Sequence, residues 1–183
     1  VTASDKSNYV MTVNDTAYHS IPASAANFYI EQFSNASIIN TNNFTLTGNT
    51  YYTSVIYNQA TNVPGIGIIT DDLTAPISAA CKVRVLYTVQ DNTVLNTPTK
   101  IAVVNQTLQD SVVQYNRTDL DFFRIQPLTG FSNIKAGNLH IRINDTPVST
   151  LTPMIAGKIY TIVVQKLNSI SGVIYNVFYY TNK

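Results

Sequence analysis

The sequence predicts an all-β protein, and three observations carry this prediction. Hydrophobic residues make up 45% of the 183 residues and charged residues only 11%, which is the composition of a globular chain rather than a disordered one. Thr, Val, Ile and Tyr are abundant, and such β-branched and aromatic side chains fit the pleated, half-buried surface of a sheet. Short segments that alternate apolar and polar residues recur, with turn-forming residues between them.

The clearest alternating segment is NLHIRIN, which begins at Asn138. Its Leu139, Ile141 and Ile143 share one face of a strand while the polar residues between them share the other, which predicts a half-buried strand. Other segments predicted as strands are NYVMTVN from Asn8, KVRVLYT from Lys82, KIAVV from Lys100, YTIVV from Tyr160 and VIYNVFYY from Val173. Turns are predicted at 47–49, 144–146 and 156–158. The one helix-like segment, residues 105–115, fits neither period well and is expected to be loop or strand.

The chain contains two copies of one strand-rich unit. NFTLTGNTYYTSVIYNQATNVPGIGIITDD, from Asn43, matches PMIAGKIYTIVVQKLNSISGVIYNVFYYTN, from Pro153. Both run through an apolar strand, a turn glycine, the pair Tyr-Thr, a second apolar strand, a polar loop and a third apolar strand. Upstream, ANFYIEQ at Ala26 matches GNLHIRI at Gly137, and VMTVNDT at Val10 matches IAVVNQT at Ile101. Because the order is preserved, two tandem antiparallel β-sandwiches are predicted.

The boundary is predicted in IITDDLTAPISAACKVRV, residues 68–85, which places one unit at 1–76 and the next at 77–183. Formal charge also steps here, from net −4 over residues 1–80 to net +5 over residues 81–183. This step indicates electrostatic complementarity between the halves or between neighbouring molecules, with chance segregation on solvated faces as the alternative.

The motifs around this boundary resemble a known family. They are Tyr-Thr before an apolar strand, a glycine-containing loop, TDDLTAP and then KVRVLYT. In this order they resemble the junction between tandem copies of a bacterial domain of unknown function, family 4397, most strongly at residues 48–88 and 135–165. The resemblance implies secreted or lipid-anchored envelope proteins built of tandem immunoglobulin-like or transthyretin-like sandwiches, and it brings no established catalytic residues.

The first repeat departs from this pattern, because it has no counterpart of KVRVLYT unless NYVMTVN fills that place. Either its first strand lies upstream of Val1, or its sheet has an open edge that something else covers.

The residues that could carry chemistry are few. His19, His140 and Cys81 show no zinc-like spacing, and no cofactor motif is recognised. Asp71 and Asp72 could contribute to a calcium site, but a solvated linker pair is the preferred interpretation, because adjacent strand residues point to opposite faces.

Two further carboxylates and the single cysteine also have structural interpretations. Asp119 and Asp121, at i and i+2, would lie on the same face of a strand. Because glycosidases use a pair of carboxylates, a glycan-active hydrolase is an alternative function. Salt bridges to neighbouring arginines explain the two residues more simply. Cys81 lies in mid-chain, far from any apolar signal core, so we interpret it as a small residue at a strand start rather than a lipid-attachment site.

The expected function is therefore a non-catalytic cell-envelope binding or adhesion module of unknown ligand. A net charge of +1 speaks against nucleic acid as a partner, and a surface glycan or an envelope protein is expected instead. Arg84, Arg124 and Arg142 are weak candidates for binding an acidic ligand. The alternative within non-enzymes is a structural or assembly subunit of a surface complex, joined through its charge-complementary halves or an open sheet edge.

Location is inferred from what the chain lacks and how it begins. No apolar run reaches the roughly 18 residues of a membrane span. The chain begins at Val1 rather than Met, which fits a processed product whose targeting segment has been removed. We expect a cell-surface, periplasmic or extracellular protein, with a lipid anchor on the removed segment as one option.

Overall fold

The computed structural model describes residues 25–32, 37–60, 63–89, 100–116, 130–169 and 172–182. Within these ranges all regular secondary structure is β-strand, which confirms the predicted all-β class. The strand predicted for NYVMTVN lies outside them. No helix in the described part of the chain is long and apolar enough to cross a membrane.

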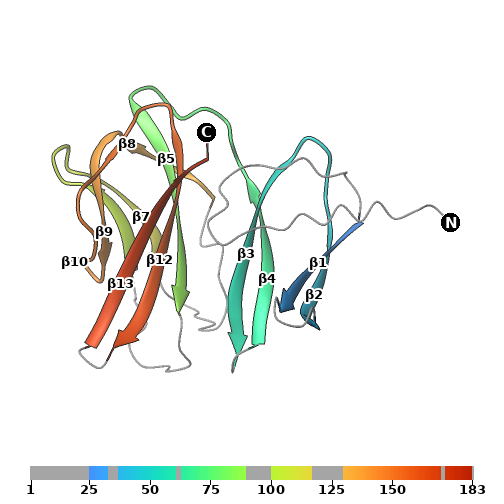
Figure 1. Cartoon of the computed structure of the whole chain (residues 1–183). Coiled ribbons are helices and arrows are strands. Elements are labelled where there is room, and N and C mark those ends of the chain that lie inside the picture. The colour runs from blue at the N-terminus through green and yellow to red at the C-terminus, as the bar shows by residue number, and fades with distance from the viewer. Residues whose placement is uncertain are drawn as a thin grey trace.

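Two sheets form the C-terminal part of the molecule (Figure 1). The first, called the β5 sheet, has the order β13-β12-β5-β8 and consists of β13 (Gly172–Thr181), β12 (Ile159–Ser169), β5 (Ala80–Val89) and β8 (Ser132–Lys135). The second, called the β9 sheet, has the order β10-β9-β6-β7 with β11 also on β9, and consists of β10 (Thr146–Pro147), β9 (Gly137–Ile143), β6 (Lys100–Asn105), β7 (Asp110–Asn116) and β11 (Thr152–Met154). Pairing is antiparallel except between β5 and β12, which run parallel.

The core lies between these two sheets, where alternate residues of each strand meet. Leu139, Ile141 and Ile143 of β9 are all buried in it, as their period-two spacing predicts. From the β5 sheet, alternate residues of β5 and β12 face them. The resulting β-sandwich is held chiefly by apolar area removed from water.

The helix-like segment 105–115 forms a turn and a strand, as expected. β6 ends at Asn105, and β7 begins at Asp110. The Asn105 side chain is fully buried; its Oδ1 accepts a hydrogen bond from Leu108 N, and its Nδ2 donates to the carbonyl oxygens of Lys135 and Ala136. A side chain that binds backbone groups in this way stabilises a turn in competition with a helix.

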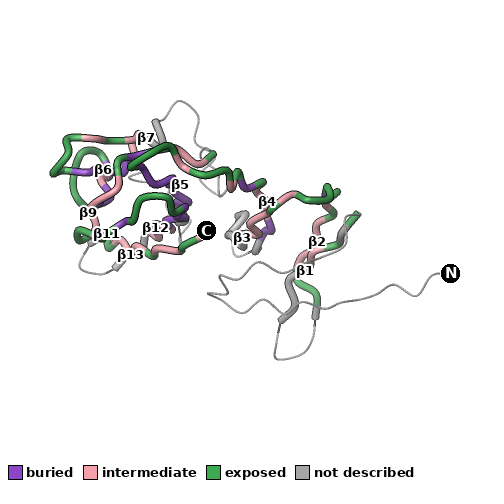
Figure 2. The backbone as a smooth tube through the Cα atoms, turned by 90° about the horizontal axis from the view of Figure 1, so that it is seen from above, coloured by how far each residue is buried: buried purple, intermediate pink, exposed green. Residues whose placement is uncertain are grey.

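Two hairpins precede the sandwich. β1 (Ala25–Gln32) pairs with β2 (Ser37–Thr45), and β3 (Tyr51–Ala60) pairs with β4 (Val63–Asp71). The β3–β4 hairpin lies between the β1–β2 hairpin and the β5 sheet (Figures 1 and 2). On the β1–β2 side, Asn42 Nδ2 donates to the carbonyl oxygen of Ile66 in β4.

The sequence repeat corresponds to repeated local geometry. Ala26 pairs with Phe44 in the β1–β2 hairpin, and Gly137, which the repeat matches to Ala26, pairs with Met154. The tyrosines of the two Tyr-Thr pairs behave alike as well. The hydroxyl oxygen of Tyr52 accepts a hydrogen bond from Thr47 N at 3.0 Å, and that of Tyr160 accepts one from Ile155 N at 3.0 Å. Each tyrosine therefore ties the start of its hairpin to the turn five residues upstream.

We predict that Ile141→Ala lowers the free energy of unfolding by about 2–5 kcal/mol, because it removes a fully buried side chain and leaves a cavity between the sheets. Denaturant unfolding followed by circular dichroism measures the change. The matched control is Ile155→Ala, at an exposed isoleucine, which should stay within about 0.5 kcal/mol of the parent. Equal effects of the two substitutions would contradict this placement of the core.

Candidate functional site

The main polar cluster among the described residues is centred on Arg84 in the middle of β5. Because Cys81, Val83 and Val85 point into the core, the alternating residues Lys82 and Arg84 point to the other face of the β5 sheet. That outer face is nevertheless covered, and Arg84 is only 1% exposed. A charge in such a place needs an opposite charge and hydrogen-bond acceptors, since burial without them is costly.

Arg84 finds these partners on three other strands or strand ends. Its Nη1 donates to Oδ1 of Asp71 at the end of β4, and its Nη2 donates to Oγ1 of Thr53 in β3. Its Nε donates to Oγ1 of Thr161 in β12 at 2.8 Å. The guanidinium also lies 4.4 Å from the ring centroid of Phe131, a cation–π distance. One side chain thus joins the β3–β4 hairpin to the β5 sheet.

The two threonines come from the two copies of the Tyr-Thr pair, and each makes the same further contact. Thr53 Oγ1 donates to Asp71 Oδ2 at 2.7 Å, and Thr161 Oγ1 donates to Asn182 Oδ1 at 2.7 Å. Asp71 and Asn182 each follow the final threonine of the matched segments. The repeat therefore places two equivalent Thr–Asp or Thr–Asn pairs beside Arg84, and only the first of them carries a negative charge.

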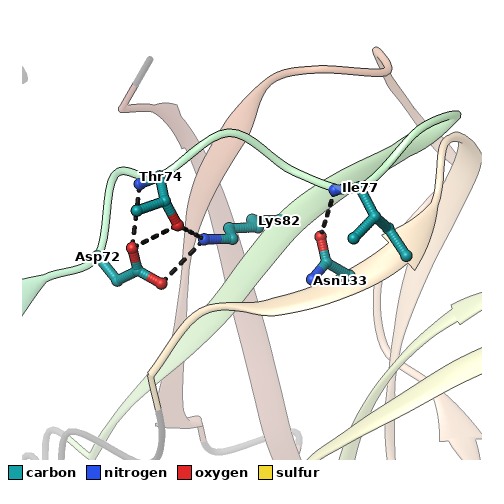
Figure 3. Close-up of polar contacts among 5 residues, drawn as sticks. All are labelled: Asp72, Thr74, Ile77, Lys82 and Asn133. Atoms are coloured by element: carbon teal, nitrogen blue, oxygen red, sulfur yellow. Dashed lines mark hydrogen bonds and ion pairs between the residues drawn. The ribbon is translucent and has the colours of Figure 1, made fainter.

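The linker between β4 and β5 has its own set of contacts (Figure 3). Asp72 Oδ1 accepts hydrogen bonds from the backbone N and the hydroxyl of Thr74, which closes a tight Asx-type turn. Lys82 Nζ donates to Asp72 Oδ2 at 2.9 Å and to Thr74 Oγ1 at 2.6 Å. The Lys82 ammonium and the Thr74 hydrogen bonds lower the pKa of Asp72 to about 2. Further along, Ile77 N donates to Asn133 Oδ1, so both ends of the linker are fixed to the β5 sheet.

These contacts bear on two interpretations of the boundary. The charge complementarity between the halves exists within one molecule, where Asp71 pairs with Arg84 and Asp72 with Lys82. The carboxylates of Asp71 and Asp72 bind different partners, Arg84 and Lys82, and do not converge on one point. Among the described residues there is no group of three side chains that could hold a metal ion. The prediction of a solvated linker pair is right for Asp72 and wrong for Asp71, which ends β4 and is buried because its carboxylate pairs with Arg84.

The arginine candidates for an acidic ligand are placed very differently. Arg84 is buried and occupied by Asp71, so its guanidinium is not accessible to a ligand in this structure. Arg124 lies outside the described residues. Arg142 is half-buried on the face of β9 that points away from the core, next to His140. Its Nε has no hydrogen-bond partner among the residues that the structure describes.

His140 lies on that same outward face of β9 but is almost completely buried. Its Nδ1 has no hydrogen-bond partner in the described part of the chain. Burial and, to a lesser extent, the positive charge of Arg142 lower the pKa of the imidazole. His140 is therefore a neutral side chain in the folded protein near pH 7.

Of the other side chains considered in the sequence, Cys81 is a core residue and the remaining three lie outside the described ranges. Cys81 is fully buried in the core, as expected for a small residue at a strand start, and burial raises the pKa of its thiol to about 11. A thiol with so high a pKa is a poor nucleophile at neutral pH. Asp119, Asp121 and His19 lie outside the described residues.

Sequence reasoning did not foresee the Arg84–Asp71 pair, although the signals were present. KVRVLYT places Arg84 opposite to Val83 and Val85, and the charge step places an acid just before it. What the sequence does not show is that the outer face of the β5 sheet is covered, and this cover turns an exposed arginine into a buried one.

No protein-family model matches the chain, and a search of curated proteins finds no match to it either.

We predict that Asp71→Ala lowers the free energy of unfolding by about 3–5 kcal/mol, because it leaves the buried Arg84 charge without its partner. The double variant Asp71→Leu/Arg84→Met should recover most of this loss, because it removes both charges and replaces them with apolar side chains. The matched control is the exposed pair of Lys100 and Asp145, whose removal should cost at most about 1 kcal/mol. Additive effects of Asp71→Leu and Arg84→Met in denaturant unfolding would show that the pair is not coupled.

We also predict that stability falls as the pH is lowered below about 6.5, the ordinary pKa of histidine. Because the pKa of His140 is lowered in the folded state, the unfolded chain binds a proton at a pH where the folded chain does not, and protonation favours unfolding. Denaturant midpoints measured from pH 7.5 to 5 should drop for the parent and drop less for His140→Gln. The drop for Arg142→Met should lie between these two, because this substitution removes the positive charge beside the imidazole but leaves the imidazole buried. Identical pH profiles for the parent and His140→Gln would contradict this assignment.

Proposed function

We propose that the chain is a non-catalytic binding or adhesion module of the cell envelope, built of two tandem strand-rich units. The observation that supports this most is the distribution of side chains in the described residues. Several charged and polar side chains are buried, and several large apolar side chains are exposed on strands and in loops. Exposed apolar side chains that lie together mark a contact surface.

The inward groups hold the fold together. The buried polar and charged residues are Asp71, Lys82, Arg84, Asn105, His140 and Thr161. Asp71, Lys82, Arg84 and Thr161 belong to the junction of the two halves, and Asn105 stabilises a turn. All of these side chains except His140 therefore make contacts that position strands or turns.

Three of the exposed large apolar side chains lie on the first hairpin. Tyr29, Ile38 and Ile39 are exposed, with Ile38 at 61%. Ile38 and Ile39 lie near the tip of the β1–β2 hairpin, where the register shifts opposite Ile30 and Glu31, so the hairpin exposes apolar side chains close to its tip. Burying such side chains against a partner gains free energy from the hydrophobic effect. The resemblance to tandem envelope domains supports an extracellular or periplasmic partner, such as a surface glycan or an envelope protein.

A second candidate function is a structural or assembly subunit. It is favoured by the Arg84 cluster, which joins the two halves through the Asp71–Arg84 ion pair and the hydroxyl of Thr53. A junction so constrained fixes the relative position of the units, which is what a spacer in a surface complex requires.

We predict that the intact chain binds a component of an array of glycans and matrix or envelope proteins, tested at low and high salt. If the hairpin surface carries binding, Ile38→Ser/Ile39→Ser should weaken it at least tenfold at either salt concentration, because apolar contacts are little screened. The matched control is Ile155→Ser, at an equally exposed isoleucine of the second half. A salt-sensitive acidic-glycan signal lost in Arg142→Ala would assign binding to Arg142 instead. A blank array would remove the adhesion proposal and leave the assembly candidate.

A further inference from the structure

One end of the β-sandwich carries three exposed apolar side chains, each on its own turn. Ile77 precedes β5, Leu108 lies between β6 and β7, and Ile155 lies between β11 and β12; their exposed fractions are 65%, 48% and 64%. The strand registers place these turns together, at the end where β5 and β12 begin and β6 and β8 finish (Figure 1). We call these three side chains the apolar tips.

Backbone hydrogen bonds join the turns of Ile77 and Ile155. Ala80 N donates to the carbonyl oxygen of Ile77 at 3.1 Å, and Lys158 N donates to that of Ile155 at 3.3 Å, so each turn is closed on itself. The carbonyl oxygen of Ala80 also accepts a hydrogen bond from Gly157 N at 2.8 Å. The two isoleucines therefore keep a fixed position relative to each other.

The turn of Leu108 is attached to the same network. Leu108 N donates to Asn105 Oδ1 at 3.1 Å, and Asn105 Nδ2 donates to the carbonyl oxygen of Ala136 at 3.2 Å. Ala136 N in turn donates to the carbonyl oxygen of Ala79, within the turn of Ile77, at 3.1 Å. Because the three turns are connected, binding through the apolar tips orders little additional chain, which lowers the cost of association.

Two exposed lysines flank the apolar tips. Lys158 closes one of the three turns, and Lys135 ends β8. The acids nearby are engaged within the molecule, since half-buried Asp110 accepts a hydrogen bond from Lys135 N and Asp72 pairs with Lys82. In the described part of the chain, the exposed charges beside the apolar tips are therefore positive, which complements an anionic partner.

We propose that this end of the sandwich docks onto an anionic lipid surface. The apolar tips insert at the level of the headgroups, and Lys135 and Lys158 lie beside the lipid phosphates. Interfacial binding of this kind increases with the apolar area buried and with attraction to anionic lipids. A protein interface has a contiguous core enriched in aromatic residues, whereas the apolar tips are aliphatic and lie on separate turns, an arrangement that suits a soft surface.

Lipid docking goes beyond the proposed adhesion through the first hairpin, because it concerns a different surface and a different ligand. The array of glycans and proteins contains no lipid, so the two proposals are tested separately. A blank array would leave lipid docking intact, and a failure to bind lipid would leave adhesion through Ile38 and Ile39 unaffected.

The first test is co-sedimentation of the intact chain with vesicles, either of phosphatidylcholine alone or of equal parts phosphatidylcholine and phosphatidylglycerol. We expect about tenfold stronger binding to the anionic vesicles at low salt. Ile77→Ser/Ile155→Ser should weaken binding about tenfold or more, because it removes two inserted side chains. The matched control, Ile38→Ser/Ile39→Ser, makes the same chemical change on the first hairpin and should bind like the parent.

The charge is tested with single substitutions of lysine. Lys158→Gln should weaken binding to the anionic vesicles and reduce its dependence on salt. Lys100→Gln should leave both unchanged, because Lys100 begins β6 at the opposite end of the sandwich. Each variant should unfold at nearly the same denaturant concentration as the parent, which separates a loss of binding from a loss of folding.

Insertion is tested with a single tryptophan, since the chain contains none. In Ile155→Trp, anionic vesicles should shift the tryptophan emission to shorter wavelength, and brominated lipid should quench it. In Ile38→Trp, on the first hairpin, the emission should stay that of a tryptophan in water. The pair measures which part of the molecule enters the lipid.

Four results would overturn the proposal. They are no binding to anionic vesicles, equal emission shifts in Ile155→Trp and Ile38→Trp, salt-sensitive binding without any shift in Ile155→Trp, and equal binding of the parent and Ile77→Ser/Ile155→Ser. The third would reduce the contact to adsorption of charge on the membrane surface. Capture of an array protein that is lost in Ile77→Ser/Ile155→Ser, together with no vesicle binding, would assign the apolar tips to a protein partner instead.

Discussion

A buried guanidinium is the constraint on which the arrangement of this molecule depends. Arg84 is fixed in β5 by its neighbours Val83 and Val85, whose burial in the core directs Arg84 to the opposite face. That face is covered by the β3–β4 hairpin, so the charge is removed from water and needs a partner there. Asp71 supplies the negative charge that pairs with the guanidinium, and the hydroxyls of Thr53 and Thr161 accept its remaining hydrogen bonds. If the hairpin lay elsewhere, Arg84 would lose its partners, so the position of the hairpin and the burial of the arginine depend on each other.

Much of the fold could be predicted because it follows from local rules. Alternation at Leu139, Ile141 and Ile143 predicts which side chains enter the core, and the structure buries all three. The match between Ala26 and Gly137 predicts a common strand pairing, and both residues pair with counterparts in the same register. Such features depend on a few neighbouring residues, and one sequence is enough to detect them.

The junction could not be predicted in the same way, because it depends on which sheet faces are covered. Arg84 and Arg142 look alike in sequence, each at a polar position of an alternating strand. In the structure Arg84 is buried against Asp71, while Arg142 stays half-buried beside a neutral histidine. The difference arises from packing between segments far apart in the chain, and alternation within a strand holds no information about it. The parallel pairing of β5 with β12 is of the same kind, since it joins residues 77 positions apart.

The same parallel pair determines how the molecule would carry a mechanical load. The linker enters the β5 sheet at Ala80, and the last strand leaves it at Thr181; both points lie at one end of the sheet, since Ile159 pairs with Lys82 and Tyr160 with Thr181. Tension applied between these points would separate the strands from that end, breaking hydrogen bonds one after another rather than all together. The Arg84–Asp71 pair connects β4 directly to the middle of β5. Under tension, this ion pair would transmit force from β4 to the middle of β5 rather than to the end of the sheet where hydrogen bonds break one after another. The contact that positions the hairpin would then also resist separation of the strands.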